Sequence, residues 1–417
     1  MQVHFITMVL NNDTYQIDGI DVLSLTEKYG TPLYVYSANK IASQYERLTN
    51  AFTATNMKVR YACKALTNLN ILKLLKNCGS GLDTVSIQEV KIGLKAGFDP
   101  KEIIFTPNGI SIAEINEAAT LGVVINIDNI SILEQFGNQH GGNIPICIRI
   151  NPHILAGGNY QISTGHIDSK FGISIHQLRH VERVVETTGL NVTGLHMHTG
   201  SEILDIDVFL RGVNILFGVA EKFPNLEFLD LGSGFKVPMA PDADSTDLEA
   251  LGIQLSEKFK DFCKEYGKEL ELWFEPGKYL VSEAGTFLAK VNVVKHTTAT
   301  VFAGIDSGFN HLIRPMFYNA YQHIVNASNP NGVERIYTVS GYICETDNFA
   351  WDRKISEIKE GDILAIHNAG AYGFEMSSNY NSRPRPPEVL IINGEDHLIR
   401  KREELDDNLR NQILLDL

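Results

Sequence analysis

The sequence predicts an α/β fold, in which a (β/α)8 TIM-like barrel is joined to a C-terminal antiparallel β domain. From residue 59 onward, short apolar runs alternate with longer stretches of helical periodicity. Eight such units occupy about 220 residues, which matches a closed parallel barrel in number and length. After about residue 285, strand-like runs follow one another with few long helices between them, as in antiparallel β structure.

Each of the eight predicted barrel strands ends in a polar residue or a glycine. The segments between them place apolar residues at i, i+3 and i+4, so they predict helices that cover the outer face of a parallel sheet. Active sites of such barrels lie at the C-terminal strand ends, which makes the terminal residues site candidates. The predicted strands are Val59–Lys64, Gly81–Ser86, Ile103–Asn108, Val123–Asp128, Pro145–Asn151, Val192–His198, Phe228–Gly232 and Leu270–Glu275.

The domain boundaries follow from the change in rhythm. We expect the barrel over residues 36–284, and the β domain over residues 1–35 and 285–417. The last segment, Glu403–Leu417, has helical periodicity. The strands expected in the β domain are Tyr15–Ile17, Leu33–Tyr36, Phe287–His296, Val301–Asp306, Arg335–Cys344, Asp362–His367, Glu388–Ile392 and His397–Lys401.

Composition excludes several classes of protein. The chain has 417 residues, 44% of them hydrophobic, and a formal net charge of −14. This charge and the lack of a basic patch argue against a nucleic-acid partner. Five cysteines, none in a C-x-x-C pair, predict neither a disulfide framework nor a zinc knuckle. No apolar run is long enough to span a membrane, so we expect a cytoplasmic protein.

Lys64 is the first candidate for chemistry. Most lysines are solvated surface charges, but this one closes the first predicted strand, at the mouth of the barrel. Partial desolvation there would disfavour the ammonium form and leave a nucleophilic amine. Such an amine forms Schiff bases with carbonyl compounds.

His196 and His198 lie two residues apart in the sixth predicted strand, so their side chains are expected on one face. Such a pair is also typical of metal ligands. A metal-dependent barrel hydrolase that uses His196, His198 and Glu275 is therefore the main alternative function. The sequence has few further histidines at neighbouring strand ends that could complete such a metal site. A metal-dependent hydrolase also gives Lys64 no role.

Two further motifs close the last predicted barrel strands. In Asp230-Leu231-Gly232-Ser233-Gly234, the glycines allow backbone N–H groups to converge on an anion, and barrels often bind phosphate at this place. In Glu275-Pro276-Gly277-Lys278, the carboxylate suits a general base, a metal ligand or a partner for a protonated ring nitrogen. An ion pair between Glu275 and Lys278 is the simpler interpretation.

The motifs together resemble the fold-type III pyridoxal-phosphate (PLP) decarboxylases, which have the alanine racemase/ornithine decarboxylase-like fold. Within this family the chain is most similar to the enzymes that decarboxylate meso-2,6-diaminopimelate to L-lysine and CO2, the last step of bacterial lysine biosynthesis. The resemblance extends from about Thr31 to Leu390, with the motifs in family order and at family spacing. It implies a homodimer with shared active sites, no bound metal, and PLP as cofactor.

The resemblance also implies roles for individual residues. Lys64 would hold the cofactor as a Schiff base, and His198 would stack on its ring with Ser201 nearby. Glu275 would face the ring nitrogen, and Cys344 would reach the partner subunit's active site and protonate the carbanion there. The cofactor phosphate would be bound by Gly232, Ser233, Gly234, Tyr372 and the loop of Pro276, Gly277 and Lys278. The substrate would be held by Arg314, Tyr318, Glu345, Lys278 and Tyr372.

The pair of Arg314 and Glu345 favours diaminopimelate as the substrate. Its distal end carries a carboxylate, which an arginine binds bidentately, and an ammonium, which a glutamate binds. Related ornithine and arginine decarboxylases usually have aspartate after the cysteine that corresponds to Cys344. Another basic amino acid as substrate, a racemase-like outcome and a non-catalytic homologue remain as alternatives.

The chain departs from the family pattern at four places. Near Lys64, Cys63 and Leu66 stand where the family usually has valine and asparagine, respectively. Ser233 replaces the middle glycine of the phosphate loop, and Lys278 replaces an arginine. Glu375 occupies a position usually held by a small residue, and nothing in the sequence explains it.

Overall fold

The computed structural model describes residues 7–52, 56–154, 169–200 and 202–417. The chain forms two compact units. The barrel unit comprises residues 42–237 and 244–280, and the β unit comprises residues 1–41, 238–243 and 281–417. No helix in the described ranges is long and apolar enough to cross a membrane.

The barrel unit contains a closed parallel sheet of eight strands, as predicted. Its strand order is β9, β11, β12, β13, β5, β6, β7, β8, and β8 pairs with β9 to close the ring. The two-residue strand β10 (Ile173–Ser174) adds to β9. The barrel strands are β5 (Met57–Ala62), β6 (Gly81–Thr84), β7 (Ile103–Phe105), β8 (Val124–Ile127), β9 (Ile146–Asn151), β11 (Val192–His196), β12 (Phe228–Asp230) and β13 (Glu271–Phe274).

Most of these strands end one to three residues earlier than predicted. The polar residues expected at the strand ends therefore lie mainly in the turns that follow. Ser86, for example, is the N-cap of helix α4, where its hydroxyl accepts a hydrogen bond from the backbone N–H of Glu89. The turns still lie at the C-terminal edge of the barrel, so the site remains where the sequence placed it.

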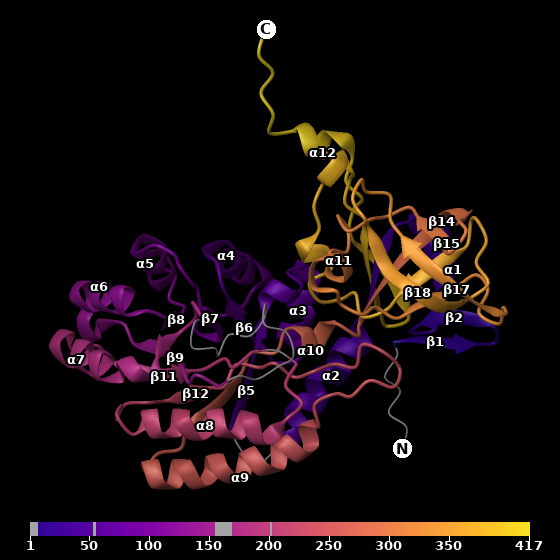
Figure 1. Cartoon of the computed structure of the whole chain (residues 1–417). Coiled ribbons are helices and arrows are strands. Elements are labelled where there is room, and N and C mark those ends of the chain that lie inside the picture. Colours follow the sequence, from indigo (N-terminus) through magenta and orange to yellow (C-terminus); the bar gives the residue numbers. More distant parts are fainter. Residues whose placement is uncertain (1–6, 53–55, 155–168, 201) are drawn as a thin grey trace. The chain divides into compact units, whose positions relative to one another are not determined.

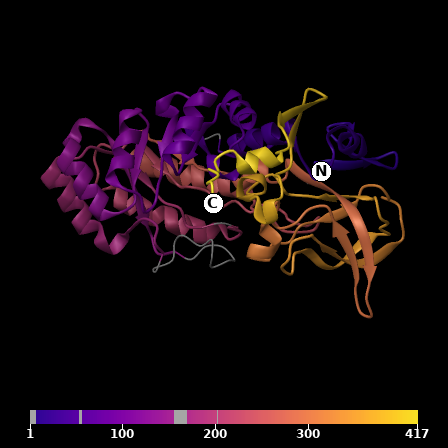
Figure 2. The ribbon, with the colours of Figure 1, turned by 90° about the horizontal axis from the view of Figure 1, so that it is seen from above.

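Helices surround the barrel strands in Figures 1 and 2, with their apolar faces buried. Most begin at an Asn, Ser or Asp N-cap, which satisfies a backbone donor of the first turn. These helices are α2 (Ala38–Ala51), α3 (Leu69–Asn77), α4 (Ile87–Ala96), α5 (Ile112–Thr120), α6 (Ile130–His140), α7 (Leu178–Thr188), α8 (Ile206–Ala220), α9 (Leu248–Tyr266) and α10 (Lys278–Val281).

Aromatic stacking fills one part of the barrel interior. The rings of Phe228 and Trp273 stack with centroids 3.6 Å apart, and the Arg60 guanidinium lies over Trp273. A Cβ at Gly194 would come within 2.1 Å of the Phe228 ring, so only glycine fits on the neighbouring strand. Trp273 pairs in register with Asp230, so this packing lies directly beneath the strand ends that carry the candidate site.

The β unit is built on a nine-stranded sheet that is mixed, whereas the sequence predicted antiparallel strands. Most pairs are antiparallel, but β15 pairs parallel with β17, and β20 pairs parallel with β4. Its strands are β4 (Leu33–Ser37), β14 (Gly285–His296), β15 (Val301–Ile305), β16 (Ile324–Asn326), β17 (Glu334–Ser340), β18 (Asn348–Ser356), β19 (Ile363–Ile366), β20 (Glu388–Ile392) and β21 (Glu395–Arg400).

Smaller elements complete the β unit. A three-stranded sheet of β1 (Met8–Asn11), β2 (Thr14–Ile17) and β3 (Ile20–Asp21) precedes α1 (Val22–Tyr29). The helix predicted over Glu403–Leu417 is reduced to α12 (Leu405–Leu409). Beyond it, Ile413, Leu414 and Leu415 are exposed, so no buried apolar face stabilises further helical turns.

Candidate active site

Lys64 lies in a 3-10 turn (Cys63–Ala65) directly after strand β5. Its Nζ is 3.1 Å from Oδ2 of Asp83, which belongs to the adjacent strand β6 and is buried. The Lys64 side chain is 43% exposed, so the desolvated amine expected from the sequence is not observed. The amine lies at the barrel mouth, held by an ion pair and open to solvent.

The Glu275-Pro276-Gly277 segment is fixed beside the Lys64 turn by backbone hydrogen bonds. The N–H of Ala62 donates to the carbonyl of Pro276 (3.2 Å), and the N–H of Glu275 donates to the carbonyl of Gly232 (2.7 Å). The sequence therefore brings the ends of β5, β12 and β13 together, as a barrel of parallel strands requires. Gly277 closes the following turn by accepting from the N–H of Leu280.

The glycine loop after β12 packs tightly against the His198 segment. Gly232 has φ +63°, and a Cβ there would come within 2.6 Å of His198 Nδ1. Gly234 has φ +118°, and a Cβ there would come within 2.2 Å of the Gly200 carbonyl. Both positions thus require glycine for conformation and for space.

Two backbone donors of this loop are engaged by side chains. The N–H of Gly232 donates to Asp230 Oδ1 (2.8 Å), and the N–H of Ser233 donates to His198 Nδ1 (3.3 Å). The second bond fixes the His198 ring just beyond β11, and it places the His198 proton on Nε2. Burial, followed by the charge of Arg149, lowers the pKa of His198 to about 3, so the ring is neutral.

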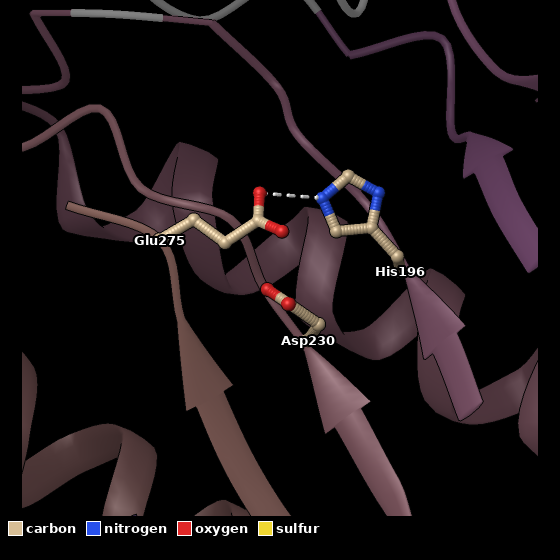
Figure 3. Close-up of side chains that lie close together, drawn as sticks. All are labelled: His196, Asp230 and Glu275. Atoms are coloured by element: carbon tan, nitrogen blue, oxygen red, sulfur yellow. Dashed lines mark hydrogen bonds and ion pairs between the residues drawn. The ribbon is translucent and has the colours of Figure 1, made fainter. Parts of the chain in front are cut away.

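His196, Asp230 and Glu275 come together at the ends of the adjacent strands β11, β12 and β13 (Figure 3). His196 Nε2 is 3.0 Å from Glu275 Oε2. One nitrogen or oxygen ligand atom from each residue lies within 4.8 Å of the others, a spacing that also suits a metal ion. The metal alternative therefore needs Asp230 in place of His198.

Asp83, Arg149 and Asp230 are site residues that the sequence analysis missed. All three are buried charged side chains inside short, otherwise apolar strands. Buried charges are costly unless they are paired or functional, so a lone Asp or Arg in a predicted barrel strand is the signal that identifies them. Burial lowers the pKa of Arg149, whereas the charges of Glu275, Asp128, Asp83 and Asp230 oppose that shift.

Lys278 forms an ion pair with Glu202 in place of the proposed pair with Glu275. Its Nζ is 2.9 Å from Glu202 Oε1, and the two side chains are 14% and 30% exposed. Glu202 has φ +65°, an uncommon value for a residue other than glycine. The neighbouring Ser201, predicted to lie near the cofactor, is outside the described residues.

In the β unit, Arg314 lies against two of the predicted substrate residues. It begins helix α11 (Arg314–Tyr318), and its guanidinium is 5.3 Å from the Tyr318 ring centroid and 5.6 Å from that of Tyr372. Tyr372 has φ +55°, a strained backbone that the surrounding structure must hold in place. The structure thus groups one guanidinium and two phenol rings.

Cys344 and Glu345 are exposed at a turn after β17. Cys344 Sγ accepts a hydrogen bond from Asn381 Nδ2 (3.3 Å), and Glu345 Oε1 accepts one from Tyr380 Oη (2.7 Å). Asp347, two residues after Glu345, is buried and accepts backbone hydrogen bonds from Phe309 and Ile343, so it rigidifies the turn. Burial raises the pKa of Asp347, and the charge of the exposed Glu345 adds to that rise.

Glu375, which stands where the family usually has a small residue, interacts electrostatically with other side chains of the β unit. This residue lies in a 3-10 turn (Phe374–Met376), and its charge raises the pKa values of Tyr36 and Arg400, although less than other causes do. Both of those residues bond the fully buried Glu388. Glu375 therefore belongs to a structural charge network of the β unit.

Comparisons with known proteins identify the family. A model described as pyridoxal-dependent decarboxylase, pyridoxal binding domain, matches residues 38–282. The chain belongs to the pyridoxal-dependent decarboxylases. A curated diaminopimelate decarboxylase of Methanothermobacter thermautotrophicus is 40% identical to it over 406 residues, which cover 95% of each protein.

Two solved structures of these decarboxylases match nearly the whole chain. Diaminopimelate decarboxylase from M. jannaschii gives a TM-score of 0.90 at 32% identity and covers 98% of both chains. The Helicobacter pylori diaminopimelate decarboxylase, solved with L-lysine, gives 0.86 at 31% identity, covering 94% of this chain and 98% of that one. The predicted fold class, a barrel with a β domain, is confirmed.

The residues of the barrel unit fit the cofactor of this family. Glu275 Oε1 is buried and is contacted by no N–H donor of the described residues, which suits an N–H donor such as a protonated ring nitrogen. Lys64 offers a solvent-accessible amine. In the loop of Gly232, Ser233 and Gly234, the N–H groups of Gly232 and Ser233 already donate to Asp230 and His198, so a phosphate at this loop would need other donors.

Proposed function

We propose that this protein decarboxylates meso-2,6-diaminopimelate to L-lysine and CO2, with pyridoxal 5′-phosphate as its cofactor. The observation that carries the proposal is the arrangement at the barrel mouth, where the partly exposed Lys64 and a buried Glu275 oxygen that no N–H of the described residues contacts lie at the ends of adjacent strands. The identity of 40% to a diaminopimelate decarboxylase supports the choice of substrate.

The barrel residues would hold the cofactor. Lys64 would carry it covalently through Nζ, and Glu275 would accept a hydrogen bond from the ring nitrogen. His198, whose ring is fixed by the Ser233 N–H, would contact the ring face. The bound cofactor supplies an electron sink for the pair left at Cα when the carboxylate departs as CO2. The phosphate would lie at Gly232, Ser233 and Gly234, with Pro276, Gly277, Lys278 and Tyr372 also assigned to the cofactor.

The β-unit residues would hold the substrate and supply the proton. Arg314 would bind the distal carboxylate bidentately, with Tyr318 and Tyr372 packed against it. Glu345, and Lys278 from the barrel, would contact the remaining charged groups. Cys344 would donate a proton from Sγ to Cα.

A homodimer is part of this proposal. Cys344 and Glu345 are exposed, on a turn that Asp347 holds rigid. An exposed thiol next to an exposed carboxylate suits a role in the active site of a partner subunit. We therefore propose that each subunit supplies Cys344 and Glu345 to the other.

Product analysis tests the function directly. The purified protein, loaded with PLP, is incubated separately with meso-diaminopimelate, L-lysine, L-ornithine and L-arginine, and CO2 and amines are measured. We expect equimolar CO2 and L-lysine from meso-diaminopimelate alone, and neither from Lys64→Ala. Preferential reaction with ornithine or arginine would overturn the substrate, and bound metal with no PLP uptake would overturn the reaction class.

A further inference from the structure

Three polar side chains share one buried position behind the proposed cofactor site. His196 ends β11, Asp230 ends β12, and Glu275 directly follows β13. The strand register aligns His196 with Asp230. They are 1%, 0% and 8% exposed, respectively, so water does not separate their charges. Figure 3 shows the three side chains converging from neighbouring strands.

His196 acts as a hydrogen-bond donor to Glu275. Its Nε2 lies 3.0 Å from Glu275 Oε2, and its Nδ1 has no partner among the described residues. A proton on Nε2 satisfies the contact and leaves only an acceptor lone pair unused, whereas a proton on Nδ1 would bury an unpaired donor. Burial lowers the pKa of His196, so the ring donates as a neutral imidazole.

Asp230 is a neutral acid in this group. Its Oδ1 accepts from the N–H of Gly232 (2.8 Å), and a hydrogen bond between the Asp230 and Glu275 side chains gives a proton on Asp230 a buried acceptor. Burial, and then the charge of Glu275, raise the pKa of Asp230 well above its usual range. Two buried carboxyl groups this close cannot both ionise, so one proton is retained on Asp230.

The group therefore carries a single negative charge, located on Glu275. His196 donates to Oε2 of that carboxylate, and no N–H donor of the described residues contacts its buried Oε1. A carboxylate fixed by one bond has little freedom to rotate, so its second oxygen keeps one direction. This is the arrangement needed to hold a proton on a ring nitrogen.

We propose that His196 and Asp230 are positioning residues: His196 fixes the Glu275 carboxylate, and Asp230 as a neutral acid confines the negative charge to it. Through Glu275 they would keep the cofactor ring nitrogen protonated. This inference rests on the proposed function and deepens it. It assigns neither residue a contact with substrate or cofactor.

Four variants test the proposal in the PLP-loaded protein. His196→Leu removes the donor, whereas His196→Gln keeps an N–H near the position of Nε2. Asp230→Asn is neutral at every pH and still accepts from Gly232. Thr193→Val is the matched control, because Thr193 lies three residues before His196 on the same strand and the substitution keeps the side-chain volume.

The decisive readout is the 15N chemical shift of PLP labelled at the ring nitrogen. We expect a protonated nitrogen in wild type, Thr193→Val, His196→Gln and Asp230→Asn, and a shift toward the unprotonated value in His196→Leu. We also expect kcat of His196→Leu to fall about 10- to 100-fold with KM unchanged, since a hydrogen bond to a charged group is lost.

Three outcomes would overturn the proposal. A wild-type 15N shift and kcat in His196→Leu would reduce His196 to a structural role. A large loss in Asp230→Asn would show that Asp230 acts as an anion. If His196→Leu does not fold, histidine 15N spectra of the wild type still decide, because a proton on Nδ1 of His196 contradicts the donor role. A wild type that makes no lysine would instead refute the proposed function.

Discussion

Lys64 Nζ and Asp83 Oδ2 form an ion pair of 3.1 Å across two neighbouring strands of the barrel. The register pairs Ala62 with Asp83, so the lysine turn begins beside the carboxylate. Asp83 is 1% exposed, while the lysine side chain is half-exposed. The pair holds the proposed cofactor-binding amine in one place at the barrel mouth.

The stability of Asp83→Asn relative to the wild type should depend on pH. Burial, and then the charge of Glu275, raise the pKa of Asp83 to about 7, although Lys64 opposes the rise. Between about pH 4 and 7 the carboxyl is protonated in the folded chain and ionised in the unfolded one, so the wild type loses stability as pH rises. The asparagine in the variant does not ionise. The free energy of unfolding of Asp83→Asn relative to the wild type should therefore rise with pH by at most about 1.4 kcal/mol per pH unit up to about pH 7. Above about pH 7 this difference should stay constant.

Urea unfolding of the cofactor-free protein at several pH values measures this difference. Asp261→Asn, at an exposed position of α9, is the matched Asp-to-Asn control. A constant difference for Asp83→Asn would show that the Asp83 carboxyl titrates alike in both states.

The sequence predicted the eight barrel strands because apolar runs are specific to buried parallel strands. It placed their ends too late, since Lys64 and Glu275 follow a strand as readily as they end one. It missed β18 (Asn348–Ser356), whose Asp352, Arg353 and Lys354 interrupt the apolar pattern. Strand direction in the β unit was wrong for two pairs, because apolar periodicity carries no information on direction.

The candidate site could be predicted only in part. Lys64, His198 and Glu275 stand at strand ends in recognisable motifs, so the sequence identified them. Partners across strands, such as the Lys64–Asp83 and Lys278–Glu202 pairs, depend on barrel register, which no local pattern encodes. A buried charge in an apolar strand would have indicated Asp83 and Asp230.

Arg314→Lys should weaken substrate binding more than catalysis. Lysine keeps the charge but loses the bidentate contact to a carboxylate and the stacking against Tyr318 and Tyr372. We expect KM for meso-diaminopimelate to rise about tenfold or more, with PLP binding unchanged. Steady-state kinetics and PLP titration check this, and an unchanged KM would remove Arg314 from the substrate site.

Cys344→Ala should lose activity without losing stability. The thiol is exposed and makes one hydrogen bond, with Asn381, so its removal should change the free energy of unfolding by about 0.5 kcal/mol or less. As the proton donor is lost, we expect kcat to fall about 100-fold or more. Cys344→Ser serves as the isosteric comparison. Full activity with unchanged product stereochemistry in Cys344→Ala would disprove the role.

Glu202→Gln should tighten PLP binding. The Glu202 carboxylate lies 2.9 Å from the Lys278 ammonium, and its removal leaves more net positive charge beside the proposed phosphate site. We expect the dissociation constant of PLP to fall about two- to fivefold, and to rise in Lys278→Ala. Fluorescence titration of the cofactor-free protein measures both. Equal constants in all three proteins would show that Lys278 does not contact the phosphate.

Covalent attachment of PLP to Lys64 tests the central claim most directly. The PLP-loaded protein is reduced with borohydride and digested, and the labelled peptide is sequenced by mass spectrometry. We expect one pyridoxyl group per chain, on Lys64, and none in Lys64→Ala. A label on another lysine, or no label, would contradict the proposed mechanism.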